Sequence, residues 1–187
     1  AVNPAGAGTA SSTPPVTPAT SANAPTGLSA TAGDGQVSVA FTAPVSDGGA
    51  AITNYEYSTD GGSNWTAFSP ATTTSPVTIT GLTNGTSYDI ALRAVNSAGS
   101  GTASSTTTVN PVTSADAPTG LSATAGDGEV SVSFTAPTNT GGAAITNYEY
   151  TTDGGSNWTA FSPATTSSPV TITGLTNGTS YDIALRA

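Results

Sequence analysis

The chain repeats itself, and the length of the repeat limits what it can fold into. Residues 21–94 align without a gap with residues 114–187, at an offset of 93 residues, and the two segments differ at only eight of their 74 positions. The first twenty residues align in the same way with residues 94–113. A period of this length is the size of a small domain, so the sequence predicts similar modules strung in a row.

The offset also predicts where the modules begin and end. We expect residues 1–20 to be the last strand and linker of a preceding repeat, residues 21–113 to be a whole repeat, and residues 114–187 to be a repeat that lacks its last strand. Both ends of the sequence fall at equivalent positions of the period, which favours a window of a continuous array. With natural ends, one copy would instead donate its first strand to the open edge of another.

Within one period, apolar and polar residues alternate, which is the spacing of β-strands and not of helices. Turn sequences separate these runs, and the pair Asp34-Gly35 is typical of a hairpin. We therefore expect an all-β fold in which seven short strands form two packed sheets. The expected core, repeated 93 residues later, consists of Val37, Val39, Phe41, Tyr55, Tyr57, Val77, Ile79, Leu82, Tyr88, Ile90 and Leu92.

The composition excludes several kinds of site. The chain has no histidine, cysteine or methionine, and its two basic residues are both arginine. These absences exclude thiol nucleophiles, Ser-His-Asp triads, the usual zinc sites and disulfides. Because the net charge is −9, little is present to neutralise nucleic-acid phosphate or an acidic membrane surface. We expect no enzymatic activity, no cofactor, no bound metal, no nucleic-acid partner and no membrane insertion of this segment.

Several segments resemble the fibronectin type III family. The run GLTNGTSYDIALRAVNSAGSG at 81–101 is similar to the family's sixth strand with the corner before it and the turn after it, and the run at 24–44 is similar to its first two strands. The resemblance implies tandem seven-stranded, immunoglobulin-like β-sandwiches. One departure is Phe41, which stands where many members of the family have tryptophan.

The same resemblance assigns a structural role to four residues. Leu82 and Tyr88, repeated as Leu175 and Tyr181, have the spacing of the family's tyrosine corner. In that corner the tyrosine ring packs inward and its hydroxyl group bonds back to the backbone.

The segment Asp60-Gly61-Gly62-Ser63-Asn64-Trp65, with Ser58 before it, resembles the Asp-box hairpin of sialidase propellers, which is itself structural. We therefore expect a turn anchored by Trp65. The alternative is a binding site in which a sugar stacks on Trp65 and Trp158.

The acidic residues offer two further candidate sites. Glu56 and Asp89 would be a carboxylate pair for glycoside hydrolysis, but alternation places them on outer strand faces, so we expect solvated surface charges. Calcium needs clustered oxygen ligands, whereas Asp34, Asp47 and Asp60 lie in different loops.

Four Asn-X-Thr sequons are candidate glycosylation sites in a host that glycosylates proteins, and they begin at Asn64, Asn84, Asn157 and Asn177.

The near-identity of the copies predicts a non-catalytic structural repeat unit of an extracellular fibre, filament or long surface protein, because equivalent copies make equivalent neighbour contacts. The expected partners are copies of itself or neighbouring repeats in a linear array, with surface glycans as a further candidate. The alternative is a spacer or accessory binding module of a secreted carbohydrate-active enzyme or adhesin. Both interpretations place the chain outside the cell or at its surface.

Overall fold

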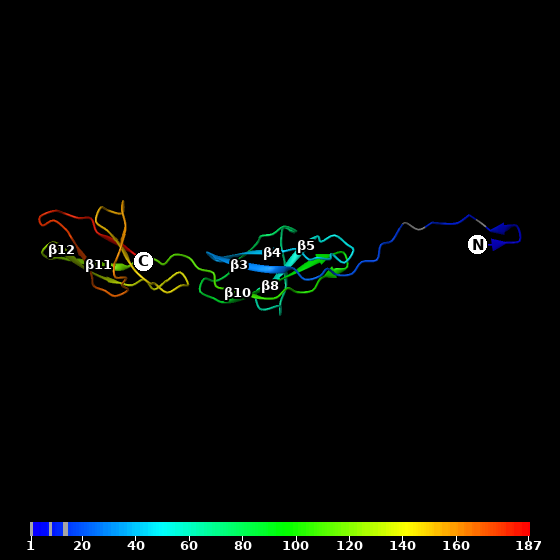
Figure 1. The fold of residues 1–187 in the computed structure, drawn as a ribbon, viewed down its shortest axis with the longest axis horizontal. Helices are drawn as coiled ribbons and strands as arrows, with labels where there is room; N and C mark the ends of the chain where they lie inside the picture. The colour runs from blue at the N-terminus through cyan, green and yellow to red at the C-terminus, as the bar shows by residue number, and fades with distance from the viewer. Residues whose placement is uncertain (1, 8, 13–14) are drawn as a thin grey trace.

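The computed structural model describes residues 2–7, 9–12 and 15–187, and these ranges contain strands, turns and loops but no helix. Figure 1 shows two β-rich modules that follow one another along the long axis of the molecule, with a short hairpin at the N-terminal end. The expected all-β fold is therefore confirmed.

The first module is a sandwich of two antiparallel sheets. One sheet has the strand order β3-β4-β7, and the other has the order β10-β8-β5-β6 with β9 also paired to β8. Its strands are β3 (Thr26–Gly33), β4 (Gln36–Thr42), β5 (Asn54–Ser58), β6 (Thr66–Ala67), β7 (Val77–Thr80), β8 (Tyr88–Asn96), β9 (Gly99–Ser100) and β10 (Thr107–Val109).

The Asp34-Gly35 pair forms the expected turn between β3 and β4. The two strands pair from Gly33, opposite Gln36, to Thr26, opposite Thr42, with one irregularity near the outer end. Gly35 has a φ of +60°, a conformation that costs glycine little and most other residues considerably more. This hairpin places Val37 and Val39 on the inner face of the sheet.

The core of the first module lies between the two sheets. The predicted residues are buried in it or, in the case of Tyr57, Leu82 and Tyr88, packed against it in partly buried positions. Phe41 and Tyr55 meet edge to face, with ring centroids 4.7 Å apart, so Phe41 fills the position where tryptophan is frequent. Ala22 and Ala94 are also fully buried, although neither was among the residues expected in the core.

The second module repeats the first but contains no counterparts of β9 and β10. Its sheets have the strand orders β11-β12-β15 and β14-β13-β16, so that β16 is an edge where β8 is not. The strands are β11 (Thr119–Ala125), β12 (Glu129–Thr135), β13 (Glu149–Thr151), β14 (Thr159–Ala160), β15 (Val170–Thr173) and β16 (Ala184–Arg186). A smaller core surrounds Val132, Phe134, Tyr148, Val170, Ile172 and Leu185.

The N-terminal hairpin consists of β1 (Val2–Asn3) and β2 (Gly6–Ala7). Its pairs, Val2 with Ala7 and Asn3 with Gly6, are the pairs that β8 and β9 make 93 residues later. The expected last strand of a preceding repeat falls partly on residues 13 and 14, which lie outside the described residues. Val16, the counterpart of Val109 in β10, lies outside the strands and is 84% exposed.

Candidate functional site

The tyrosine at the start of β8 is fixed by a local hydrogen bond. The backbone N–H of Thr83 donates to the Tyr88 hydroxyl oxygen at 3.0 Å, while the backbone N–H of Leu82 donates to the Gly35 carbonyl at 2.9 Å. These two bonds fix the corner before β8 and attach it to the hairpin formed by β3 and β4.

The second module contains the same bonds. The Thr176 N–H donates to the Tyr181 hydroxyl at 3.0 Å, and the Leu175 N–H donates to the Gly128 carbonyl at 2.9 Å. The hydrogen bond from the Thr176 backbone lowers the pKa of Tyr181 from its usual value. The Tyr88 ring packs against the core of the first module, whereas Tyr181 lines a cavity of the second module.

A closed network of hydrogen bonds holds the turn after β5. The Ser58 hydroxyl is buried, donates to Asp60 Oδ1 at 2.7 Å and accepts from the Gly62 N–H at 2.8 Å. The Asp60 carboxylate also accepts from the backbone N–H and the side-chain amide of Asn64, at 2.9 and 2.6 Å. The Asn64 amide is the largest of several contacts that lower the pKa of Asp60 to about 2. The aspartate therefore organises the turn.

The corresponding turn of the second module uses Thr151 in place of Ser58. Its hydroxyl donates to Asp153 Oδ1 at 2.6 Å and accepts from the Gly155 N–H at 3.1 Å. The Thr151 hydroxyl is the largest cause that lowers the pKa of Asp153 far below its usual range. This exchange falls on a buried position, and the hydroxyl group is the feature that both copies share.

Trp65 anchors the same turn and stacks with an arginine. Its indole N–H donates to the Gly62 carbonyl at 3.0 Å, and the Arg93 guanidinium carbon lies 4.3 Å from the ring centroid. Arg93 Nε also contacts Glu56 Oε2 at 2.5 Å, and the Ser100 hydroxyl donates to the same carboxylate at 2.9 Å. The expectation of a solvated Glu56 is wrong, because its side chain is only 20% exposed. Sequence reasoning missed this cluster, which depends on the register that places Glu56 opposite Arg93.

The second module repeats this stack, with Arg186 over Trp158 at 4.4 Å and an ion pair to Glu149. In both modules the guanidinium covers one face of the indole ring. A sugar that stacked on this face would have to displace the arginine from its carboxylate partner.

Asp34, Asp47 and Asp89 each accept a separate hydrogen bond. Asp89 accepts a hydrogen bond from the Thr108 hydroxyl at 2.6 Å, Asp34 accepts one from the Asn84 amide at 2.8 Å, and Asp47 accepts one from the Gly49 N–H at 2.8 Å. Among the described residues, no three metal-ligating side chains come together.

Each of the four sequon asparagines uses its side-chain amide in such a turn. Asn64 and Asn157 donate to Asp60 and Asp153 at 2.6 Å. Asn84 donates to Asp34 at 2.8 Å, and its counterpart Asn177 donates to Asp127 at 2.6 Å. Asn84 is partly buried whereas Asn177 is exposed, because only Asn84 lies where the two modules meet.

The linker between the modules is hydrogen-bonded to both of them. The Gly85 N–H donates to the Pro111 carbonyl at 2.9 Å, and the Val112 N–H donates to the Gly33 carbonyl at 3.2 Å, which fixes the linker to the first module. The Thr113 N–H donates to the Gly141 carbonyl of the second module at 2.8 Å. The Pro111 side chain is fully buried, so the linker is part of the packed structure.

The two modules also touch directly through glycines. A Cβ atom on Gly142 would lie 2.4 Å from the Gly85 nitrogen, and one on Gly85 would lie 3.0 Å from the Gly142 Cα. Gly142 has a φ of +91°, which is itself unfavourable for other residues. The junction therefore requires glycine on both sides.

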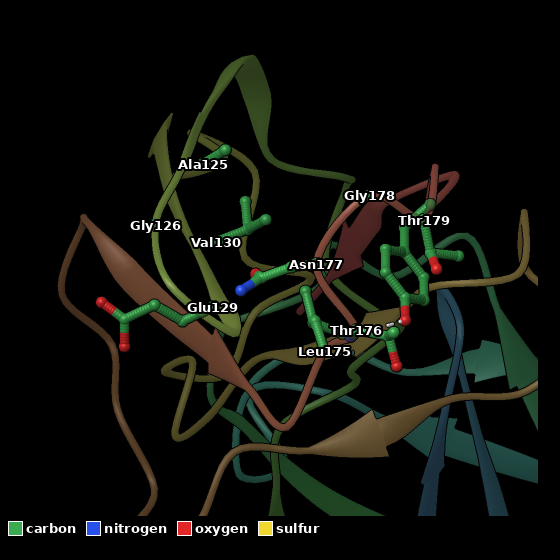
Figure 2. A pocket seen from close by; sticks show the side chains of 10 residues that line it. Ala125, Gly126, Glu129, Val130, Leu175, Thr176, Asn177, Gly178 and Thr179 are labelled. Carbon is green, nitrogen blue, oxygen red and sulfur yellow. Dashed lines mark hydrogen bonds between the residues drawn. The ribbon is translucent and has the colours of Figure 1, made fainter.

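At the far end of the second module, a cavity of about 110 Å³ takes the place that the linker fills in the first. Figure 2 shows Val130, Leu175 and Asn177 around this cavity and the Glu129 carboxylate directed away from them. Its lining also includes Gly126 and Gly178, the counterparts of the two glycines that bind Pro111 and Val112. The junction and this cavity together form the candidate functional site.

The fibronectin type III domain profile matches residues 23–110. No match was found among curated proteins. The solved structures that are similar include domains A168–A170 of titin, at 25% identity and a TM-score of 0.44, covering 49% of this chain and 32% of that one. They also include the FN1–FN3 domains of chicken CNTN1, at 17% identity and a TM-score of 0.48, covering 89% of this chain and 62% of that one. The chain thus spans about a third of the titin structure and under two thirds of the CNTN1 structure.

The family assignment agrees with the two sheets, the paired tyrosine corners and the order of the strands. Domains of this family are generally non-catalytic structural or binding modules, and many occur in extracellular proteins. None of the described residues belongs to a helix of the length and apolarity needed to cross a membrane. Residues 23–110 therefore form a fibronectin type III domain, and residues 114–187 repeat residues 21–94 almost unchanged.

Proposed function

We propose that this chain is a non-catalytic structural repeat unit, whose modules are joined head to tail in a linear array of an extracellular fibre, filament or long surface protein. The observation that carries the proposal is the junction. Pro111 and its neighbours bond to both modules, and Gly85 and Gly142 bring the two backbones into contact. A junction that holds successive modules in a fixed relation transmits length and direction along an array.

The surface supports the same function. Charged residues make up only 7% of the sequence, whereas about a quarter is usual. The carboxylates of Asp34, Asp60, Asp89 and Glu56 are each engaged in a hydrogen bond or an ion pair. Few carboxylates are therefore free to act as the acid or base of an enzyme.

The junction can be tested by measuring the distance between the modules. Thr31 and Thr124 are equivalent, exposed positions on β3 and β11, and a chain without cysteine accepts a spin label at each of them after Thr→Cys replacement. We expect a narrow distance distribution in electron–electron resonance. Gly142→Val should broaden it, because the new side chain would collide with Gly85.

A matched control is present in the first module. Gly49 is the counterpart of Gly142, with a φ of +85°, and a Cβ atom there would meet nothing closer than the Pro18 carbonyl at 3.4 Å. Gly49→Val therefore imposes the same local strain without the collision, and it should leave the distribution narrow. A broad distribution in the unmodified chain, or equal broadening by both substitutions, would contradict a rigid array.

A binding role of the modules is tested separately on a glycan array. Turnover of any glycan, or saturable binding that Trp65→Ala and Trp158→Ala abolish together, would favour the accessory-module alternative.

A further inference from the structure

A cavity of about 260 Å³ opens on the side of the first module that lies away from β10. Strand β6 ends one sheet and strand β7 ends the other, and residues of both strands line the cavity. It therefore lies where the free edges of the two sheets face each other. Neither the junction between the modules nor the Trp–Arg cluster contributes a residue to its lining.

The apolar part of the lining is an aromatic pair held in a fixed position. The rings of Tyr57 and Phe68 have centroids 4.9 Å apart, and Ile79 lines the cavity from the opposite sheet. The Phe68 backbone is held on both sides, because its N–H donates to the Tyr55 carbonyl at 3.1 Å and its carbonyl accepts from the Asn54 amide at 3.0 Å. The aromatic surface is thus formed before any ligand arrives.

The polar part of the lining is uncharged and without partners in the protein. Among the described residues, none forms a hydrogen bond with the hydroxyl group of Tyr57, and solvent reaches this group, since no buried side-chain oxygen or nitrogen there lacks a partner. The lining also includes Thr66, Ser69, Thr78 and Thr80, whose hydroxyl groups form no hydrogen bond within the described ranges. Because β7 is an edge strand, it also presents unpaired backbone groups.

This lining matches the chemistry of a neutral sugar. No charged residue lines the cavity, so a phosphate, carboxylate or ammonium group would find no ionic partner in it. A sugar ring has a face of C–H groups that packs on aromatic rings and hydroxyl groups that donate and accept hydrogen bonds. The volume is near the lower end of the range of about 300–1,000 Å³ usual for small-ligand sites, which suits one or two sugar rings.

An extended peptide is the competing occupant, since free sheet edges bind added strands. Strand β6 has only two residues and β7 has four, which leaves little length for pairing. Pro76 directly precedes β7, and Pro70 follows shortly after β6. Proline has no N–H group to give to a strand ladder. The two edges therefore favour a compact ligand over an added strand.

The same arrangement is present in the second module. The rings of Tyr150 and Phe161 have centroids 4.9 Å apart. The Phe161 N–H donates to the Tyr148 carbonyl at 3.1 Å, and the Phe161 carbonyl accepts from the Asn147 amide at 2.9 Å. Every residue that lines the cavity of the first module has an identical counterpart 93 residues later. An array of these modules would therefore carry one such site in each module.

We propose that each module binds a neutral saccharide in this cavity, between β6 and β7 in the first module and between β14 and β15 in the second. The aromatic pair packs against the sugar ring, and the Tyr57 hydroxyl and the edge of β7 form its hydrogen bonds. The site goes beyond the proposed function and does not require a rigid array. It is also separate from Trp65, whose ring is stacked with Arg93. Equivalent weak sites along one chain would raise the affinity for a polymer that reaches several of them.

NMR titration of the ¹⁵N-labelled 187-residue chain tests the proposal. The neutral probes are maltotriose, cellotriose and mannotriose, and trigalacturonate is the acidic control. We expect at least one neutral trisaccharide to shift the amide resonances of Phe68 and Ile79, and of their counterparts Phe161 and Ile172, in a saturable way, while trigalacturonate does not. Absence of saturable shifts at these residues with all three neutral probes, or equal binding of trigalacturonate, would overturn the proposal.

The double substitution Tyr57→Phe and Tyr150→Phe keeps both rings and removes only the hydroxyl groups. It should weaken saccharide binding by roughly threefold to tenfold, the effect of losing one hydrogen bond. The matched control is Tyr55→Phe with Tyr148→Phe, because these tyrosines precede the first pair by two residues and do not line the cavity. The control should leave the affinity unchanged, and so should Trp65→Ala with Trp158→Ala.

Equal weakening by the two pairs of tyrosine substitutions would overturn the proposal, as would shifts centred on Trp65 and Trp158. The distance between the spin labels is measured independently of any sugar. A narrow distance distribution without saccharide binding would therefore keep the array and remove the site, whereas binding with a broad distribution would keep the site and remove the array.

Discussion

The two modules have nearly the same sequence, but residues 1–187 contain the last strand of the first module alone. In the first module, Val37 and Ile90 are completely buried, whereas their counterparts Val130 and Ile183 are partly exposed. Leu121 is 40% exposed, while its counterpart Leu28 is partly buried against the core. The comparison isolates what residues 95–113, with β9, β10 and the linker, contribute to a sandwich whose other residues are held almost constant.

The loss does not spread through the whole module. Val77 and Ile79 of β7 are as buried as their counterparts Val170 and Ile172 in β15. The turn after β5, the tyrosine corner and the Trp–Arg stack are also present in both modules. The exposed core residues lie next to the missing strand and linker, so the damage is local, as expected when packing depends on direct contact.

The largest effect should come from restoring the strand. Extending the chain after Ala187 with the sequence of residues 95–113 should stabilise the second module by roughly 3 kcal/mol or more, because several apolar side chains become fully buried. Each module contains one tryptophan, so urea unfolding followed by fluorescence reports on the second module in a Trp65→Phe chain and on the first in a Trp158→Phe chain.

The control is an extension in which the residue equivalent to Val109 is aspartate and the residue equivalent to Pro111 is glycine. This extension has the same length but should recover little of the stability. If the two modules of the unextended chain unfold at the same urea concentration, the strand contributes nothing measurable and the comparison fails.

A smaller effect should distinguish the same core residue in the two modules. Ile90→Ala should destabilise the first module by about 2–5 kcal/mol, the usual range for a fully buried isoleucine. Ile183→Ala should cost the second module roughly half as much, because Ile183 already contacts water. The same fluorescence measurement checks both values, and equal losses would mean that the open edge is covered in solution.

Much of the first module could be predicted from the sequence, because alternation identifies which side of a strand faces the core. Val37, Phe41 and Leu92 are where this pattern placed them. The pattern could not find the stack of Arg93 on Trp65, since it depends on the pairing of strands far apart in the sequence. The pattern also could not find the junction between the modules. Pro111 and the Gly141-Gly142 pair are residues typical of linkers and turns, but the sequence does not show that they bring the two modules into contact.

The smallest effect concerns a feature that both modules keep, the aspartate of the turn after β5. Hydrogen bonds hold the pKa of Asp60 at about 2, below the usual value near 3.8, so the folded state favours the carboxylate. The stability this provides is fully present above the unfolded pKa and is lost as the pH falls through the folded pKa. We expect it to disappear between about pH 4 and pH 2.

In the second module this loss should extend to lower pH, because the Thr151 hydroxyl lowers the pKa of Asp153 further. Thr151→Ser should raise that pKa toward the value of Asp60, and Ser58→Thr should move Asp60 in the opposite direction. NMR titration of the carboxyl carbons measures both shifts, and Thr165→Ser serves as a control because it changes a hydroxyl-bearing residue outside this turn. Identical titration of Asp60 and Asp153 would show that the buried methyl group of threonine, which distinguishes the two turns, does not influence the geometry of the hydroxyl.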